Sequence, residues 1–130
     1  MILYVDSSSL AKALVDEPDS DATIAVLRSA SAVVTSELAH VELRRRHHRL
    51  GLPDADRRVD DLLARCDVVR LDRPLLLAAG RLSAADLGSL DAIHLATALQ
   101  LGGHLASFVT HDLVLGRAAQ AHDLDVTTPT

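Results

Sequence analysis

Short apolar runs alternate along the chain with longer segments in which apolar residues recur at helical spacing. The apolar runs predict five strands, at residues 2–5, 32–36, 67–71, 105–110 and 125–128. The periodic segments predict seven helices, at residues 8–18, 19–30, 36–51, 53–66, 72–82, 87–103 and 111–124. This alternation is typical of α/β domains, so we expect a three-layer α/β/α architecture on a mainly parallel sheet of four to five strands.

Short right-handed connections between the strands favour the order 3-2-1-4-5. In that order the second and third strands are added on one side of the first strand, and the fourth and fifth on its other side. The direction therefore reverses between the strands at 2–5 and 105–110. Ligands of open α/β sheets bind beside the carboxyl ends of the strands at such a point. Asp6 ends the first of these strands and Asp112 follows the second, so we expect both carboxylates to face one crevice.

The composition narrows the class of protein. The 130 residues, 48% of them hydrophobic, fit a single domain, which we place at residues 1–130. The only cysteine, Cys66, excludes an internal disulfide and a thiolate cage for a metal, as is typical of a reduced, cytoplasmic protein.

No apolar run reaches the roughly 18 residues that indicate a membrane span. A formal net charge of −5 gives no overall attraction for nucleic acid, although a local basic patch is compatible with it.

Asp6 and Asp112 each allow two interpretations. Asp6 stands just before a predicted helix and Asp112 at the start of another, where an aspartate commonly acts as the N-cap or complements the helix dipole. The serines at 7–9 follow Asp6 and are able to cap the helix themselves, so capping alone does not account for Asp6. The other interpretation is that both acids serve the expected crevice.

Glu42 and Asp91 lie inside predicted helices. We expect Ser36 to cap the helix that carries Glu42, and the alternative to a functional role is a solvated glutamate paired with Arg46 one turn later. Asp91 opens the most apolar helix, where burying an acid is costly unless a cation meets it. In the predicted helix at 53–66, we expect Pro53 to lie just inside the first turn.

The basic stretch and the histidines are less specific. The run RRRHHR at 44–49 is either a solvated helix end or a basic face that directs a phosphate backbone toward the acids through Arg46 and Arg49. The seven histidines are scattered and form no metal motif. His94 follows Asp91 by three residues, and we interpret it as a packed or capping histidine.

Four segments, taken in order, carry a resemblance to a known family: VDSSSLAK, TSELAHVELRRR, LGSLDAIHLATAL and FVTHD. The chain resembles PIN-domain proteins and, more narrowly, the VapC ribonuclease toxins of prokaryotic toxin–antitoxin pairs. The resemblance implies a catalytic site made of Asp6, Glu42, Asp91 and Asp112, with Ser8 and Thr110 in support. It also implies a homodimer and a VapB-type antitoxin that blocks the acidic site.

The chemistry of these side chains agrees with a metal-dependent nuclease. Several carboxylates without a cysteine or histidine cage suit a hard cation, Mg²⁺ or Mn²⁺. We expect hydrolysis of RNA phosphodiester bonds, in structured RNA such as tRNA or rRNA, leading to arrest of translation and growth. Asp6, Asp91 and Asp112 are the expected metal ligands, and Glu42 is expected to position or deprotonate the attacking water.

Two other functions compete with this one. A catalytically inactive PIN-like module would dock a partner through its acidic pocket without cleaving RNA. A phospho-receiver domain also places an acid at the end of a strand, but it requires a lysine late in the chain, and Lys12 is the only lysine here.

Overall fold

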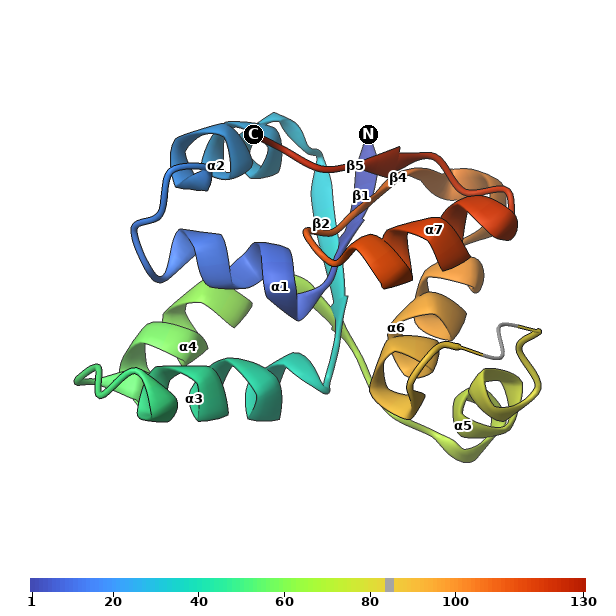
Figure 1. The fold of residues 1–130 in the computed structure, drawn as a ribbon, viewed down its shortest axis with the longest axis horizontal. Coiled ribbons are helices and arrows are strands. Elements are labelled where there is room, and N and C mark those ends of the chain that lie inside the picture. Colours follow the sequence, from blue (N-terminus) through green and yellow to red (C-terminus); the bar gives the residue numbers. More distant parts are fainter. Residues whose placement is uncertain (84–85) are drawn as a thin grey trace.

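A fully parallel sheet of five strands organises the protein (Figure 1). The structure is a computed structural model that describes residues 1–83 and 86–130. Its strands are β1 (Ile2–Val5), β2 (Ala32–Ser36), β3 (Asp67–Val69), β4 (Leu105–Val109) and β5 (Val126–Thr127). They lie in the order β3-β2-β1-β4-β5, which confirms the predicted order.

Seven α-helices of the described residues cover the two faces of the sheet. They are α1 (Ser7–Leu10), α2 (Ser20–Ser29), α3 (Ala39–Arg49), α4 (Ala55–Leu63), α5 (Arg73–Gly80), α6 (Ser89–Leu99) and α7 (Leu113–Ala121). Helices α1 to α4 lie on one side and α5 to α7 on the other (Figure 1). The predicted three-layer α/β/α class is therefore confirmed. None of these helices combines the length and apolar character needed to cross a membrane.

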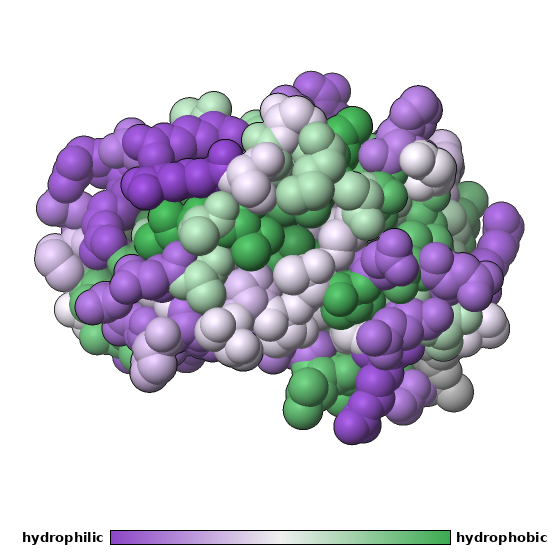
Figure 2. Space-filling view, turned by 90° about the horizontal axis from the view of Figure 1, so that it is seen from above, coloured by the Kyte–Doolittle hydropathy of each residue, from purple (hydrophilic) through white to green (hydrophobic). Residues whose placement is uncertain are grey.

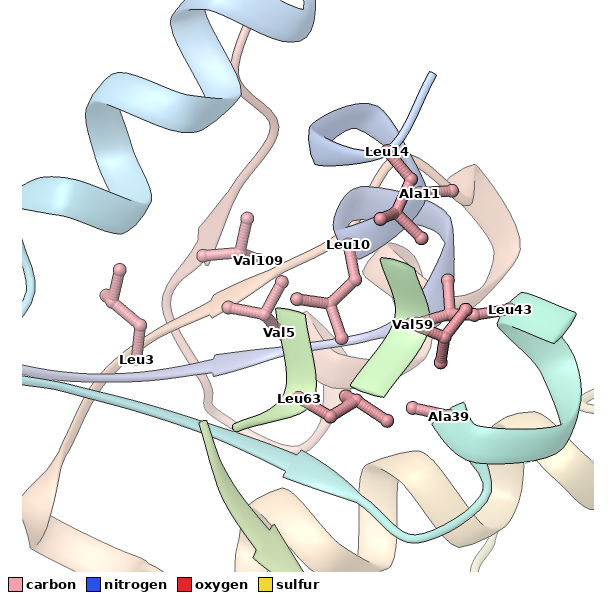
Figure 3. Packing of buried hydrophobic residues seen from close by; sticks show 10 residues of the cluster. All are labelled: Leu3, Val5, Leu10, Ala11, Leu14, Ala39, Leu43, Val59, Leu63 and Val109. Carbon is pink, nitrogen blue, oxygen red and sulfur yellow. The ribbon is translucent and has the colours of Figure 1, made fainter. Parts of the chain in front are cut away.

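The strand β1 explains why two layers of helices form. Its successive side chains point to opposite faces of the sheet. Leu3 and Val5 pack into one cluster with residues of α1, α3 and α4 (Figure 3). Tyr4 packs into a second cluster with Phe108 of β4 and residues of α6 and α7. A four-residue strand thus supports a core on each face.

Several helices begin later than the sequence predicted. The helix expected from Ser36 begins at Ala39, because Ser36 is the last residue of β2. Its hydroxyl accepts a hydrogen bond from the amide of Leu38 (3.1 Å) in the turn before the helix. Pro53 lies before α4 rather than inside it, and Asp54 is the N-cap residue.

Two predicted helices were too long because 3₁₀ turns continue them. The segment predicted at 8–18 is helix α1 followed by a turn at Ala11–Ala13. The segment predicted at 87–103 is helix α6, which ends at Leu99, and a separate turn at Gly102–His104. A 3₁₀ turn keeps nearly the same spacing of apolar positions as an α-helix, so the sequence pattern does not separate the two.

The strands give the molecule two distinct ends. The face that carries both chain termini has apolar groups across its middle and hydrophilic groups toward both sides (Figure 2). Strand β1 begins at the N-terminus, and the other four strands run parallel to it. The loops that follow the strands therefore gather at the opposite end, where ligands of such sheets bind.

The N-cap of α5, in the loop that follows β3, offers a test of the fold. A carboxylate oxygen of Asp72 accepts a hydrogen bond from the amide of Leu75 (2.9 Å). We expect Asp72→Ala to lower the free energy of unfolding in urea by about 1 kcal/mol, because it leaves a helix-end amide without its acceptor. Asp72→Asn keeps an acceptor and should stay close to wild type. Equal losses in the two variants would contradict the cap.

Candidate active site

A polar cleft of about 190 Å³ opens at the carboxyl ends of β1 and β4. The chain topology creates it, because β1 and β4 are parallel neighbours and their last residues, Val5 and Val109, are paired. The cleft is lined by Asp6, Ser7, Ser8, Glu42, Leu43, Arg46, Arg49, Asp91, His94 and Asp112. The structure thus brings together the four acids singled out in the sequence, although they come from four different segments.

Asp6 lies at the base of the cleft and is only 4% exposed. Its oxygens accept hydrogen bonds from the hydroxyls of Ser8 (2.7 and 2.9 Å) and Thr110 (2.8 Å). One oxygen also accepts from the amide of Ser9 (3.1 Å), so Asp6 is the N-cap of α1. The expectation that the serines would make a cap at Asp6 unnecessary was wrong. Asp6 both caps the helix and lines the cleft.

Burial and hydrogen bonding act on Asp6 in opposite directions. Burial raises the pKa of its carboxyl, and the hydrogen bonds from Ser8 and Thr110 offset only part of that increase. Burial disfavours the charged form, whereas donors aimed at the oxygens favour it. The charge of Asp6 is therefore costly, and a cation in the cleft would stabilise it.

Thr110 and Ser8 connect the acids to the backbone. The Thr110 hydroxyl donates to Asp6 and accepts from the amide of Asp112 (3.0 Å). The Ser8 hydroxyl donates to Asp6 and accepts from the amide of His111 (3.0 Å). Each hydroxyl thus joins the end of β1 to the segment after β4, and together they orient Asp6.

Glu42 is held from two sides. Its Oε1 accepts hydrogen bonds from the Ser7 hydroxyl (2.8 Å) and from Nε2 of His94 (2.7 Å). Burial raises the pKa of Glu42, but the hydrogen bond and charge of His94 and the hydrogen bond from Ser7 outweigh it, so the pKa is lowered. Glu42 is therefore ionised at neutral pH.

The pairing of Glu42 with Arg46, considered from the sequence, does not occur. Arg46 lies near Glu17 instead (3.6 Å). Arg46 is partly buried and Arg49 is exposed, and both line the cleft. The cleft therefore combines four acids with two cationic groups.

Asp91 and Asp112 differ in how firmly they are held. Asp112 is the N-cap of α7, and its Oδ1 accepts from the amide of Leu115 (3.1 Å). The carboxylate of Asp91 takes part in no hydrogen bond with the described residues. Burial raises the pKa of Asp91, and the neighbouring charge of Asp112 raises it further. Asp91 is thus free to turn toward a ligand.

The donor set fits a hard divalent cation in its chemistry. Carboxylate oxygens are the ligands that Mg²⁺ and Mn²⁺ prefer. Burial and, after it, repulsion from Asp112 raise the pKa of Asp91, and a cation would relieve that repulsion. Across residues 1–83 and 86–130, no group of three or more His, Cys, Asp or Glu side chains already has an arrangement that could hold a metal ion. Binding of a metal ion would require side chains of the cleft to turn, and no hydrogen bond with the described residues holds the Asp91 carboxylate in place.

The sequence interpretation missed two residues of this cleft. Ser7 was interpreted as a helix cap, and His94 as a packed or capping histidine. Both donate to the same oxygen of Glu42. The spacing of His94, three residues after Asp91, indicated a shared helix face, but it carried no sign of contact with α3.

Comparison with known proteins identifies the family. The PIN domain family matches residues 3–121, so the chain belongs to that family. Ribonuclease VapC46 of Mycobacterium tuberculosis is 40% identical over 129 residues, which cover 98% of this chain and 97% of that protein. Ribonuclease VapC47 of the same species is 38% identical over 115 residues, which cover 85% of each chain. Within the PIN domain proteins, this chain belongs with the VapC ribonucleases, and the resemblance seen in the sequence is confirmed.

Solved structures share the fold. VapC20 of Mycobacterium tuberculosis, described as a sarcin-ricin loop cleaving toxin, aligns with a TM-score of 0.74 and 17% identity over 98% of this chain and 99% of that chain. VapBC2 of Rickettsia felis, solved bound to a DNA fragment from its promoter, aligns with a TM-score of 0.74 and 15% identity over the full length of both chains. At these identities the likeness concerns the fold.

The repulsion around Asp91 has a measurable consequence. Its folded-state pKa lies above the ordinary value of 3.8, so the carboxyl favours the folded state below that value. The favourable contribution is lost as the pH rises through the folded-state pKa. In EDTA at neutral pH we expect Asp91→Asn to melt a few degrees higher than wild type, and the difference should shrink as the pH falls toward about 4. Thermal melts across this pH range measure it.

A matched variant separates this effect from a general change in charge. Asp61→Asn makes the same chemical change on an exposed residue of α4, and it should give no such gain. If Asp91→Asn melts at or below the wild-type temperature at neutral pH, the carboxylates are not under the repulsion inferred here.

Proposed function

We propose that this protein is a divalent-metal-dependent endoribonuclease that acts as the toxin of a VapBC-type toxin–antitoxin pair. The cleft carries this proposal: four carboxylates from four segments meet there at the carboxyl ends of parallel strands. Membership of the PIN domain family supports the fold and site, and relatives named as ribonucleases support the reaction.

The chain's own carboxylates would hold the ion. Asp6, Asp91 and Asp112 would be its ligands, with Ser8 and Thr110 keeping Asp6 in place. A bound Mg²⁺ or Mn²⁺ would supply Lewis-acid chemistry, which acidifies a water and neutralises charge on the phosphodiester. The ion would also offset the cost of the buried charge on Asp6 and of the repulsion at Asp91.

Glu42 would act on the attacking water. Its lowered pKa keeps it ionised, so it is able to accept a hydrogen bond or a proton from a water in the cleft. Its Oε1 is already occupied by two donors, which leaves Oε2 for that water. General-base catalysis requires contact of this kind with the nucleophile.

The arginines would offset the repulsion between an acidic cleft and RNA. Arg46 and Arg49 follow Glu42 on α3 at one and two turns and line the same cleft. Guanidinium groups bind phosphate oxygens in a bidentate manner. We infer that they contact the RNA backbone on either side of the bond to be cut, without specifying its sequence.

The substrate and partners follow from the relatives as part of the proposal. Structured RNA such as tRNA or rRNA is the proposed substrate, in line with a structural neighbour described as cleaving the sarcin-ricin loop. A VapB-type antitoxin would cover the acidic cleft, and the toxin would form a homodimer. It would act in the cytoplasm, where these RNAs are found, as a single PIN domain over residues 1–130.

Cleavage of RNA tests the reaction directly. We expect purified protein to cut structured RNA in Mg²⁺ or Mn²⁺ and to lose activity in EDTA, with recovery when the ion is restored. Asp91→Asn should lower kcat by roughly a hundredfold or more, because it removes a charged ligand that no neighbour replaces. Gel analysis of end-labelled RNA measures both.

Asp72→Asn is the matched control, because it changes an acid at a helix start that does not line the cleft. It should cleave at the wild-type rate. Activity that persists in EDTA and in Asp91→Asn would end the metal-dependent proposal. Metal binding without RNA cleavage would favour a binding module.

The role of the arginines has its own test. We expect Arg49→Ala to weaken binding by the same factor for RNAs of different sequence. It should also reduce the slope of log affinity against log salt by roughly 0.7 to 0.9. Arg57→Ala removes an exposed arginine on α4, outside the cleft, and should leave the slope unchanged. Equal slopes for Arg49→Ala and wild type would exclude Arg49 from the RNA contact.

A further inference from the structure

One buried histidine beside the cleft has no place in the mechanism derived so far. His94 lies on α6, one turn after Asp91, and is 1% exposed. A buried histidine usually needs partners for both ring nitrogens, since an unpaired polar group away from water is costly. His94 has a partner on each: Glu42 at Nε2 (2.7 Å) and the hydroxyl of Tyr4 at Nδ1 (2.6 Å).

We propose that His94 is a positioning residue for Glu42: its Nε2–H donates to Oε1, and Tyr4 fixes the ring for that task. This inference rests on the proposed function, because it assigns Glu42 to the attacking water. It extends the site from residues that face the cleft to a hydrogen-bonded chain of side chains that runs from Tyr4 through His94 to Glu42.

The protonation of each atom follows from its partner. An ionised carboxylate only accepts hydrogen bonds, and the pKa of Glu42 is lowered, so Nε2 of His94 carries the proton between them. A neutral imidazole with hydrogen on Nε2 is an acceptor at Nδ1, so the Tyr4 hydroxyl, 2.6 Å away, donates there and favours this tautomer.

Packing holds this chain in one orientation. Tyr4 is fully buried and stacks on Phe108, with ring centroids 5.2 Å apart and planes 18° from parallel. The His94 ring meets Tyr4 edge to face, at 5.9 Å and 70°. Tyr4 and Phe108 are the only aromatic residues of the chain, and both serve this stack. Burial and these ring contacts restrain the Tyr4 and His94 rings in the orientation of their hydrogen bond.

The hydrogen bond from His94 makes the two oxygens of Glu42 unequal. Ser7 and His94 both donate to Oε1, from α1 and α6 respectively. Among the described residues, Oε2 has no hydrogen-bond partner, and Glu42 lines the cleft. Two donors on one oxygen fix the direction of the carboxylate and leave the other oxygen for water. Removing His94 would let the carboxylate rotate about its last bond.

Two amide substitutions at position 94 separate positioning from packing. A glutamine places its amide nitrogen near the position of Nε2, within reach of Glu42, whereas the shorter asparagine matches only Nδ1. Both are polar and smaller than histidine, so both lose stability. We expect His94→Asn to lower kcat by roughly tenfold to a hundredfold, as expected for the loss of one hydrogen bond to a charged group. His94→Gln should recover most of that loss, with KM for RNA unchanged in both.

Two further variants complete the kinetic comparison. Tyr4→Phe keeps the aromatic stack but removes the donor to Nδ1, and it should lower kcat by several fold. His47→Asn removes another histidine that is 1% exposed, on the same helix as Glu42, and it should lower stability while leaving kcat unchanged. Equal kcat values for His94→Asn, His94→Gln and wild type would overturn the proposal.

A measurement without RNA separates this inference from the proposed function. In ¹⁵N NMR of the full chain at neutral pH, we expect His94 to show a protonated Nε2 and a bare Nδ1, and Glu42→Gln should shift the Nε2 signal. A bare Nε2 would overturn the hydrogen bond to Glu42, and a protonated Nδ1 would overturn Tyr4 as the donor. If the wild-type protein cleaves no RNA yet shows the expected signals, the proposed function fails while the Tyr4–His94–Glu42 chain stands.

Discussion

Negative charges held close together and away from bulk water are the constraint on which this structure depends. The parallel sheet brings the carboxyl ends of its strands to one place, and the chain puts acids there. Asp6 is stabilised by three donors and Glu42 by two, whereas the Asp91 carboxylate has no hydrogen bond among the described residues. Asp112 is held as well, by the amide of Leu115, so Asp91 is the one acid of the four that is free to turn toward a cation.

The strand β1 connects this constraint to the core. Leu3 and Val5 support the helices of one face, while Tyr4 points to the other face and stacks on Phe108. Asp6 follows directly at the end of the strand. This four-residue strand thus supports both layers and places a cleft acid at its end, and Tyr4 also reaches a second acid through His94. A change in β1 would act on the core and the cleft together.

The sequence predicted the strands and their order well because two simple rules cover them. Apolar runs mark strands buried on both faces, and right-handed crossovers restrict the order in which they lie. The ends of the helices were predicted less well. Whether Ser36 ends a strand or begins a helix depends on its pairing with Val69 of β3, which no local pattern contains. Capping by Asp6 was missed for a similar reason, since serines and aspartate are equally suitable caps.

The sequence by itself placed Asp6 and Asp112 at one crevice through the strand order, and its resemblance to the VapC ribonucleases added Glu42 and Asp91 to them. The tertiary structure decided which partner each acid takes. Glu42 does not pair with Arg46, one turn away, but with His94, 52 residues away, while Arg46 approaches Glu17. Sequence spacing describes neighbours on one helix, whereas these contacts depend on how α1, α3 and α6 pack around the end of β1. A hydrogen bond needs atoms within about 3 Å, and only the packed fold brings them that close.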